Sequence, residues 1–150
     1  MQLQDIYNNA CKHFAAMPEP SMAFIGEDGE DGFQCAYRGE NNASCIIGSF
    51  IPDSLYNPSL EGDSFYWQHG DKDFHNSRVS NVVAEAFEQE RLTLTQYALL
   101  SELQKVHDRN AEDWKAENPS TRTWFVFIKP LLAQVASQFN LESPVLEESK

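Results

Sequence analysis

The stretch FQCAYRGENNASCII, residues 33–47, decides which fold class the sequence predicts. Apolar and polar side chains alternate over 33–38 and again over 43–47, with the two-residue period of β-strands. A three-residue loop between these segments places Cys35 opposite Cys45. One face of the paired segments is then apolar and the other mostly polar, which is typical of a half-buried antiparallel hairpin.

Outside this hairpin the sequence predicts helices, because apolar residues recur every three or four positions. Thr93 and Gln96 fit a capping box, and Asn57 fits the cap of a short turn at 57–62. Pro130 predicts a kink in the last helix or a helix that begins near Lys129. The predicted helices cover 3–16, 80–90, 94 to about 114, and 124–139.

These elements together predict an α+β protein, mostly helical, with one antiparallel β-hairpin packed on about four helices. The 150 residues contain no internal repeat and no linker, so a single domain over 1–150 is expected. The stretch 63–80 is aromatic and polar without a clean period, and it is expected to be a long loop.

The chain is strongly acidic, with 23 acidic and 11 basic residues and a net charge of −12. Such a charge repels nucleic acid and anionic membranes and favours a protein partner with a basic surface. The alternative is that the negative charge only keeps the protein soluble. The segment GEDGEDG at 26–32 is expected to be an exposed acidic loop, and 141–150 a frayed acidic tail. The ligand spacing of an EF-hand is absent, so calcium is not predicted there. The partner-binding candidates are the acids of this loop: Glu27, Asp28, Glu30 and Asp31.

The first residues lack the basic start and apolar run of a secretory signal, and no apolar stretch has the length of a membrane span. The three cysteines are an odd number, which fits a reducing compartment better than a disulfide framework. A cytoplasmic protein is therefore expected.

Two arrangements of cysteine and histidine have residue types that could carry chemistry. Cys35 and Cys45 could bind zinc with a distant histidine, but the paired close spacing of zinc sites is missing and two buried, reduced thiols are expected instead. Cys35, His107 and Asp108 have the residue types of a nucleophile, base and orienting acid. Neighbours on a helix do not face each other, however, and His107 is expected at the surface near a helix C-terminus. No catalytic residue, metal or cofactor is predicted.

A small ligand could instead meet polar residues around the hairpin and the segment 52–62. Arg38 is suited to a phosphate or carboxylate, Asp53 and Glu61 are possible paired acids, and His107 is a possible acid–base group. The phosphate-loop, dinucleotide, zinc-protease and serine-hydrolase motifs are absent from the sequence. The ligand-binding candidates are Arg38, Asp53, Tyr56, Glu61, His107 and Asp108.

Several of these residues belong to a longer pattern: C-x-Y-R-G at 35–39, C-x-x-G-x-x-I-P-D-x-x-Y at 45–56, E-G at 61–62 and L-Q-x-x-H-D at 103–108. The pattern resembles that of a family of small proteins of phages, prophages and bacteria. Ser44 departs from it, because the family usually has a basic residue there. The resemblance implies an origin, as an accessory protein of a mobile element, and no particular chemistry.

The sequence thus supports two hypotheses about function. The first is a phage or prophage accessory protein, in the host cytoplasm, that binds a host or defence protein through its acidic surface, for example as a mimic of nucleic acid. The alternative is a small ligand-binding protein or enzyme with its site at the hairpin and 52–62. Whether it is an enzyme and whether it forms oligomers stay open.

Overall fold

The computed structural model describes the whole chain except residues 25–32, 40–43, 62–64, 66–77, 117–122 and 145–150. The acidic loop and most of the expected loop at 63–80 therefore lie outside the described residues, as does the end of the acidic tail. The start of that tail is held by hydrogen bonds: the amide N of Glu142 donates to Gln4 Oε1 over 3.0 Å, and Ser143 Oγ lies 3.3 Å from Tyr7 Oη.

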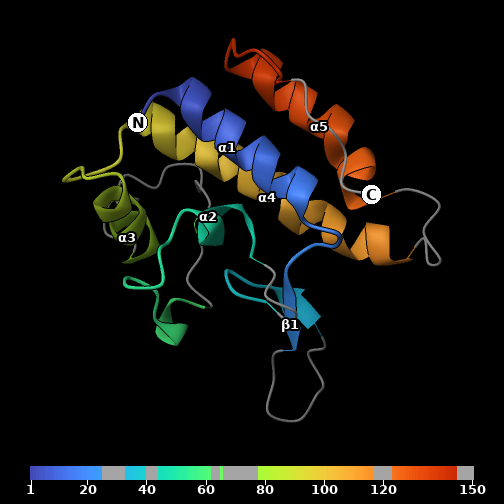
Figure 1. Cartoon of the computed structure of the whole chain (residues 1–150), viewed down its shortest axis with the longest axis horizontal. Coiled ribbons are helices and arrows are strands. Elements are labelled where there is room, and N and C mark those ends of the chain that lie inside the picture. Colours follow the sequence, from blue (N-terminus) through green and yellow to red (C-terminus); the bar gives the residue numbers. More distant parts are fainter. Residues whose placement is uncertain (25–32, 40–43, 62–64, 66–77, 117–122, 145–150) are drawn as a thin grey trace.

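Three helices in mutual contact form the main body: α1 (Leu3–Ala16), α4 (Leu94–Ala116) and α5 (Trp124–Gln138). In Figure 1, α1 lies along α4 in the same direction, and α5 returns beside them. All three were expected from the spacing of apolar residues, and the structure confirms them with their ends close to those predicted. Their buried faces belong to one core cluster.

The ends of these helices follow the local capping signals. The amide N of Gln96 donates to Thr93 Oγ1 over 3.1 Å, and the amide N of Thr93 donates to Gln96 Oε1 over 2.9 Å, so the predicted capping box is confirmed. Thr123 caps α5 through a bond from the amide N of Val126 to its Oγ1. α5 therefore begins well before Lys129 and passes through Pro130.

A second group of short elements lies on the other side of α1 and α4 from α5, as Figure 1 shows. It comprises α2 (Ile46–Ser49), a 3-10 turn at Pro58–Leu60 and α3 (Arg78–Ala86). Asn57 caps the turn, as expected, by accepting from the amide N of Ser59 over 2.9 Å. α3 begins two residues before Ser80, which is buried within the helix and does not cap it.

The predicted α+β class and its β-hairpin are wrong: the described chain is a helical protein. The segment that was to be the second strand forms α2 instead. Phe33–Cys35 has strand geometry but pairs antiparallel with Met22–Phe24, in a ladder of only three residues on each side. Four consecutive residues, Cys45 to Gly48, are buried, whereas a half-buried strand would bury every second residue. The burial of all four residues fits a short helix inside the core and not a strand with one face exposed to solvent.

Candidate functional site

Four of the predicted ligand-binding residues meet around the carboxylate of Glu61. Glu61 Oε1 accepts from the amide N of Tyr37 over 2.9 Å. Its Oε2 accepts from the amide N of Arg38 over 3.0 Å and from Tyr56 Oη over 2.7 Å. Burial and the bond to Glu61 raise the pKa of Tyr56 to about 12, so its hydroxyl keeps its proton and remains a donor. We call Arg38, Asp53, Tyr56 and Glu61, with the Tyr37 amide, the Glu61 cluster.

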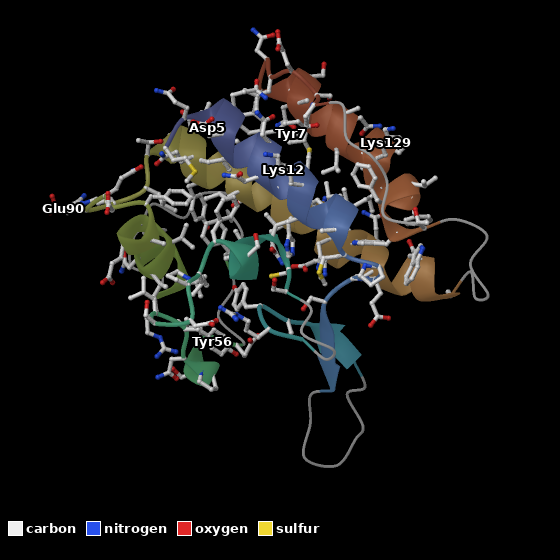
Figure 2. The ribbon with its side chains drawn as sticks, in the orientation of Figure 1. Asp5, Tyr7, Lys12, Tyr56, Glu90 and Lys129 are labelled. Atoms are coloured by element: carbon white, nitrogen blue, oxygen red, sulfur yellow. The ribbon has the colours of Figure 1, made fainter. Side chains whose placement is uncertain are left out.

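The guanidinium of Arg38 completes this cluster. Its Nη1 donates to Asp53 Oδ1 over 2.7 Å, and its Nη2 donates to the carbonyl O of Ile51 over 2.7 Å. The guanidinium carbon lies 4.9 Å from the centre of the Tyr56 ring, which gives a cation–π contact. Figure 2 shows Tyr56 beside the 3-10 turn, away from α1 and α5. The cluster thus joins Tyr37 and Arg38 to the stretch 51–61 and so closes the chain that contains α2.

Gly48 lets α2 lie against the backbone at Tyr37. A Cβ atom at Gly48 would lie 2.8 Å from the carbonyl carbon of Tyr37 and closer still to its oxygen. Before it, Cys45 caps α2 by accepting at Sγ from the amide N of Gly48 over 3.4 Å. Burial raises the pKa of the Cys45 thiol, which makes it a poor nucleophile and metal ligand. The sequence predicted Cys45 on a strand opposite Cys35, and this prediction is wrong. Cys45 is instead the N-cap residue of α2.

The other two candidates, His107 and Asp108, form a separate polar network on α4. His107 is only 2% exposed, so the expected surface position is wrong. The amide N of Ser21 donates to its Nε2 over 2.9 Å, which leaves the ring proton on Nδ1, 2.8 Å from Asp108 Oδ1. Side-chain rotation thus allows two neighbouring residues to meet, contrary to the prediction. Burial and nearby His13 lower the pKa of His107 to about 3, so the ring is neutral.

Gln104 links this network to α2. Its Nε2 donates to Asp108 Oδ1 over 2.8 Å, and its Oε1 accepts from the amide N of Ile47 over 3.1 Å. On the other side, His13 Nε2 bonds to the carbonyl O of Ser44. The side chains of α1 and α4 thus hold the chain at Ser21, Ser44 and Ile47. Sequence reasoning quoted Gln104 and Gly48 only as part of a pattern and missed their roles.

This geometry leaves the six ligand-binding candidates in two groups, and both groups have structural bonds. Both nitrogens of His107 have partners, and the Glu61 carboxylate accepts three hydrogen bonds. Within the described residues, no three histidine, cysteine or acidic side chains lie close enough to hold a metal ion. The buried Nε of Arg38 has no hydrogen-bond acceptor in the described part of the chain. The partner-binding candidates Glu27, Asp28, Glu30 and Asp31 lie outside that part.

Comparison with known proteins places the chain in no family. Neither the protein-family models, nor the curated proteins, nor the solved structures gave a match. None of the described helices combines the length and the apolar character needed to cross a lipid bilayer.

Replacing Glu61 with alanine is expected to lower the free energy of unfolding by about 2–3 kcal/mol. The substitution removes the carboxylate that accepts from the Tyr37 and Arg38 amides and from the Tyr56 hydroxyl. Water reaches this part-buried cluster, so the loss stays below that of three fully buried donors. Urea denaturation measures the change. The control is Asp53→Ala, which removes a carboxylate that is 92% exposed and should cost less than about 1 kcal/mol. Equal losses in the two variants would show that Glu61 does not hold the loop closed.

Proposed function

We propose that the protein is a phage or prophage accessory factor that binds a host or defence protein through an acidic surface in the host cytoplasm. The observation that carries this proposal is that the chain has a large negative charge, whereas the reactive side chains of its described part are used to hold the fold. The net charge is −12. The candidate reactive groups of the described chain, Glu61, His107 and Cys45, are engaged in bonds that hold the fold. An excess of negative charge is then the strongest feature left for recognition.

The resemblance to mobile-element proteins supports the same proposal. The residues that carry the resemblance include Tyr37, Gly48, Glu61 and His107, and each of them makes a contact that closes the fold. A shared scaffold therefore accounts for the pattern without a shared reaction. The alternative function, a ligand-binding protein or enzyme, needs polar groups free to meet a ligand, and Glu61 and His107 are occupied. We therefore favour the binding protein.

Exposed acids occur at several places on the described surface. Asp5 lies in the first turn of α1, Glu85 lies on α3, and Glu90 follows α3. Figure 2 shows Glu90 extending from the edge of the molecule and Asp5 near the start of α1. A protein with a basic nucleic-acid channel would attract such a surface, and the attraction would weaken with added salt. The acidic loop at 26–32 adds four more acids in seven residues.

Affinity capture with two variants of equal charge tests the proposal. Each variant removes four negative charges from the −12 of the chain. One neutralises the four acids of the segment 26–32, and the other neutralises four exposed acids of the described surface. The loop variant carries Glu27→Gln, Asp28→Asn, Glu30→Gln and Asp31→Asn. The control variant carries Glu85→Gln, Glu90→Gln, Asp113→Asn and Glu142→Gln.

We expect the unmodified chain to capture a defined protein from bacterial lysate at about 50 mM salt and to lose it at about 500 mM. The loop variant should lose the partner at both salt concentrations, whereas the control variant should keep most of it at low salt. A chain that captures no protein at either concentration would contradict the proposal. So would a partner that both variants retain at high salt.

A further inference from the structure

A groove runs between α4 and α5. It consists of two adjoining hollows of about 300 and 170 Å³ that share Glu102, Lys105 and Gln138. None of the candidate residues of the Glu61 cluster or the His107 network lines it. The groove is therefore a surface of its own, separate from the polar groups that hold the fold.

One end of the groove is apolar. Leu94, Ala98 and Phe139 line it. Leu94 is 56% exposed, and among the described residues it is one of only two large apolar side chains that are exposed. An apolar side chain of a partner that entered this hollow would be buried beside Leu94 and Phe139.

The other end of the groove is basic. Lys105 and Arg109 lie one helical turn apart on α4, and both line it. The chain has only 11 basic residues against 23 acidic ones, so two cations in one groove run against its overall charge. Glu102 lies 3.3 Å from Lys105, but both side chains are partly exposed. An ion pair between residues three positions apart on one helix is worth only about 0.2–0.5 kcal/mol, so Lys105 can turn to an incoming carboxylate.

The distance between the two ends defines the size of the occupant. Leu94 and Arg109 are separated by fifteen positions on one continuous helix, which corresponds to about 22 Å at about 1.5 Å per residue. An amphipathic helix of about 15 residues has this length and offers apolar side chains at intervals of three or four along one face. Acidic side chains near one end of that face would meet Lys105 and Arg109.

We propose that the α4–α5 groove is a docking site for an acidic amphipathic helical segment of a partner protein. Apolar side chains of the segment bind beside Leu94 and Phe139, and its carboxylates bind Lys105 and Arg109. The complementary charges fix the direction of the segment in the groove. This inference goes beyond the proposed function. The proposed function uses the acidic surface and requires a basic partner, whereas the groove binds an acidic segment.

A library of random 16-residue peptides displayed on yeast tests the proposal, because it lets the full chain select its own ligand. We expect the enriched peptides to be acidic, with leucine or phenylalanine at helical spacing. The groove variant Lys105→Gln with Arg109→Gln should bind them about tenfold more weakly. Leu94→Ser should weaken binding severalfold. The matched control is Lys12→Gln with Lys129→Gln, which removes the same charge from exposed positions outside the groove (Figure 2) and should change binding less than about twofold.

Thermal melting checks that each variant folds, and these substitutions at partly or fully exposed positions should leave the melting temperature within a few degrees of that of the unmodified chain. No enrichment, or enrichment of basic or uncharged peptides, would overturn the proposal. Equal binding by the groove and control variants would overturn it as well. Sedimentation that reveals a dimer lost in the Leu94→Ser variant would assign the groove to a second copy of the chain instead. None of these results depends on the acidic loop, so failure here leaves the proposed function standing.

Discussion

Replacing Gly48 with alanine is expected to lower the free energy of unfolding by more than about 3 kcal/mol, and the melting temperature by roughly 6–12 °C. The new Cβ atom would lie 2.8 Å from the carbonyl carbon of Tyr37 and closer to its oxygen. The obstacle is backbone, which cannot turn aside as the end of a side chain can. Either α2 or the segment at Tyr37 must move, and the Tyr37 amide is itself bonded to Glu61 over 2.9 Å.

Thermal and urea denaturation measure this effect, with Ser49→Ala as the control on the same short helix. Ser49 is exposed, and its hydroxyl donates to the carbonyl O of Ile46. Its loss should cost less than about 1 kcal/mol. Because Gly48 and Glu61 act on the same segment, the double variant Gly48→Ala with Glu61→Ala should lose less stability than the sum of the single losses. A Gly48→Ala protein as stable as the Ser49→Ala protein would contradict this account of the glycine.

The sequence predicted the helices well because their signals are local. Apolar residues at intervals of three and four mark α1, α4 and α5, and the Thr93–Gln96 capping box marks where α4 begins. Asn57 marks the 3-10 turn in the same way. Each of these signals lies within a few residues of the element that it predicts, so no knowledge of distant contacts is needed.

The hairpin prediction failed because its outcome depends on distant contacts. The alternation from Ala43 to Ile47 resembles a strand, but Gln104 on α4 accepts from the amide N of Ile47, and Cys45 caps a helix. Both bonds satisfy backbone groups that a β-ladder would otherwise pair. Nothing near residue 45 indicates that a glutamine almost sixty positions later will be its neighbour.

The proximity of four candidate residues was predicted, while their use as a ligand-binding site stays a prediction. Arg38, Asp53, Tyr56 and Glu61 were selected together, and the structure brings them together. Their structural role, to hold this part of the chain together, was not predicted. The residue type shows that a carboxylate accepts hydrogen bonds, but it does not show which donors lie next to it in the fold. The position of His107 was predicted wrongly for a related reason. The apolar residues of a helix predict its buried face, and a histidine is not among them. The ring of His107 is nevertheless buried, because the amide N of Ser21 and Asp108 Oδ1 satisfy its two nitrogens.

Lowering the pH from 7 to 5 is expected to reduce the free energy of unfolding by about 2 kcal/mol through His107 alone. Burial and His13 lower its pKa from 6.5 to about 3 in the folded chain. Asp108 Oδ1 already accepts from Nδ1 of the neutral ring, whereas a second ring proton, on Nε2, would displace the bond from the amide N of Ser21. Above pH 6.5 the ring is neutral in both the folded and the unfolded chain, so it adds no pH dependence. Between pH 6.5 and 3 the unfolded chain binds a proton that the folded chain does not, and stability falls as the pH falls.

The variant His107→Gln isolates this contribution. We expect it to be less stable at pH 7, because glutamine replaces a ring that packs against Trp124 with a centroid distance of 5.9 Å. Between pH 7 and 5, however, its stability should fall by about 2 kcal/mol less than that of the unmodified chain, since the one-proton difference is gone. Gln96→Ala is the control, because it breaks the capping box without removing a titratable group and should keep the full pH dependence. The pH range stays above the ordinary pKa of exposed carboxyl groups, so most of them remain ionised throughout. Parallel curves for the unmodified chain and the His107→Gln variant would show that His107 takes up a proton in the folded chain as readily as in the unfolded one, and that the Ser21 amide does not keep it neutral.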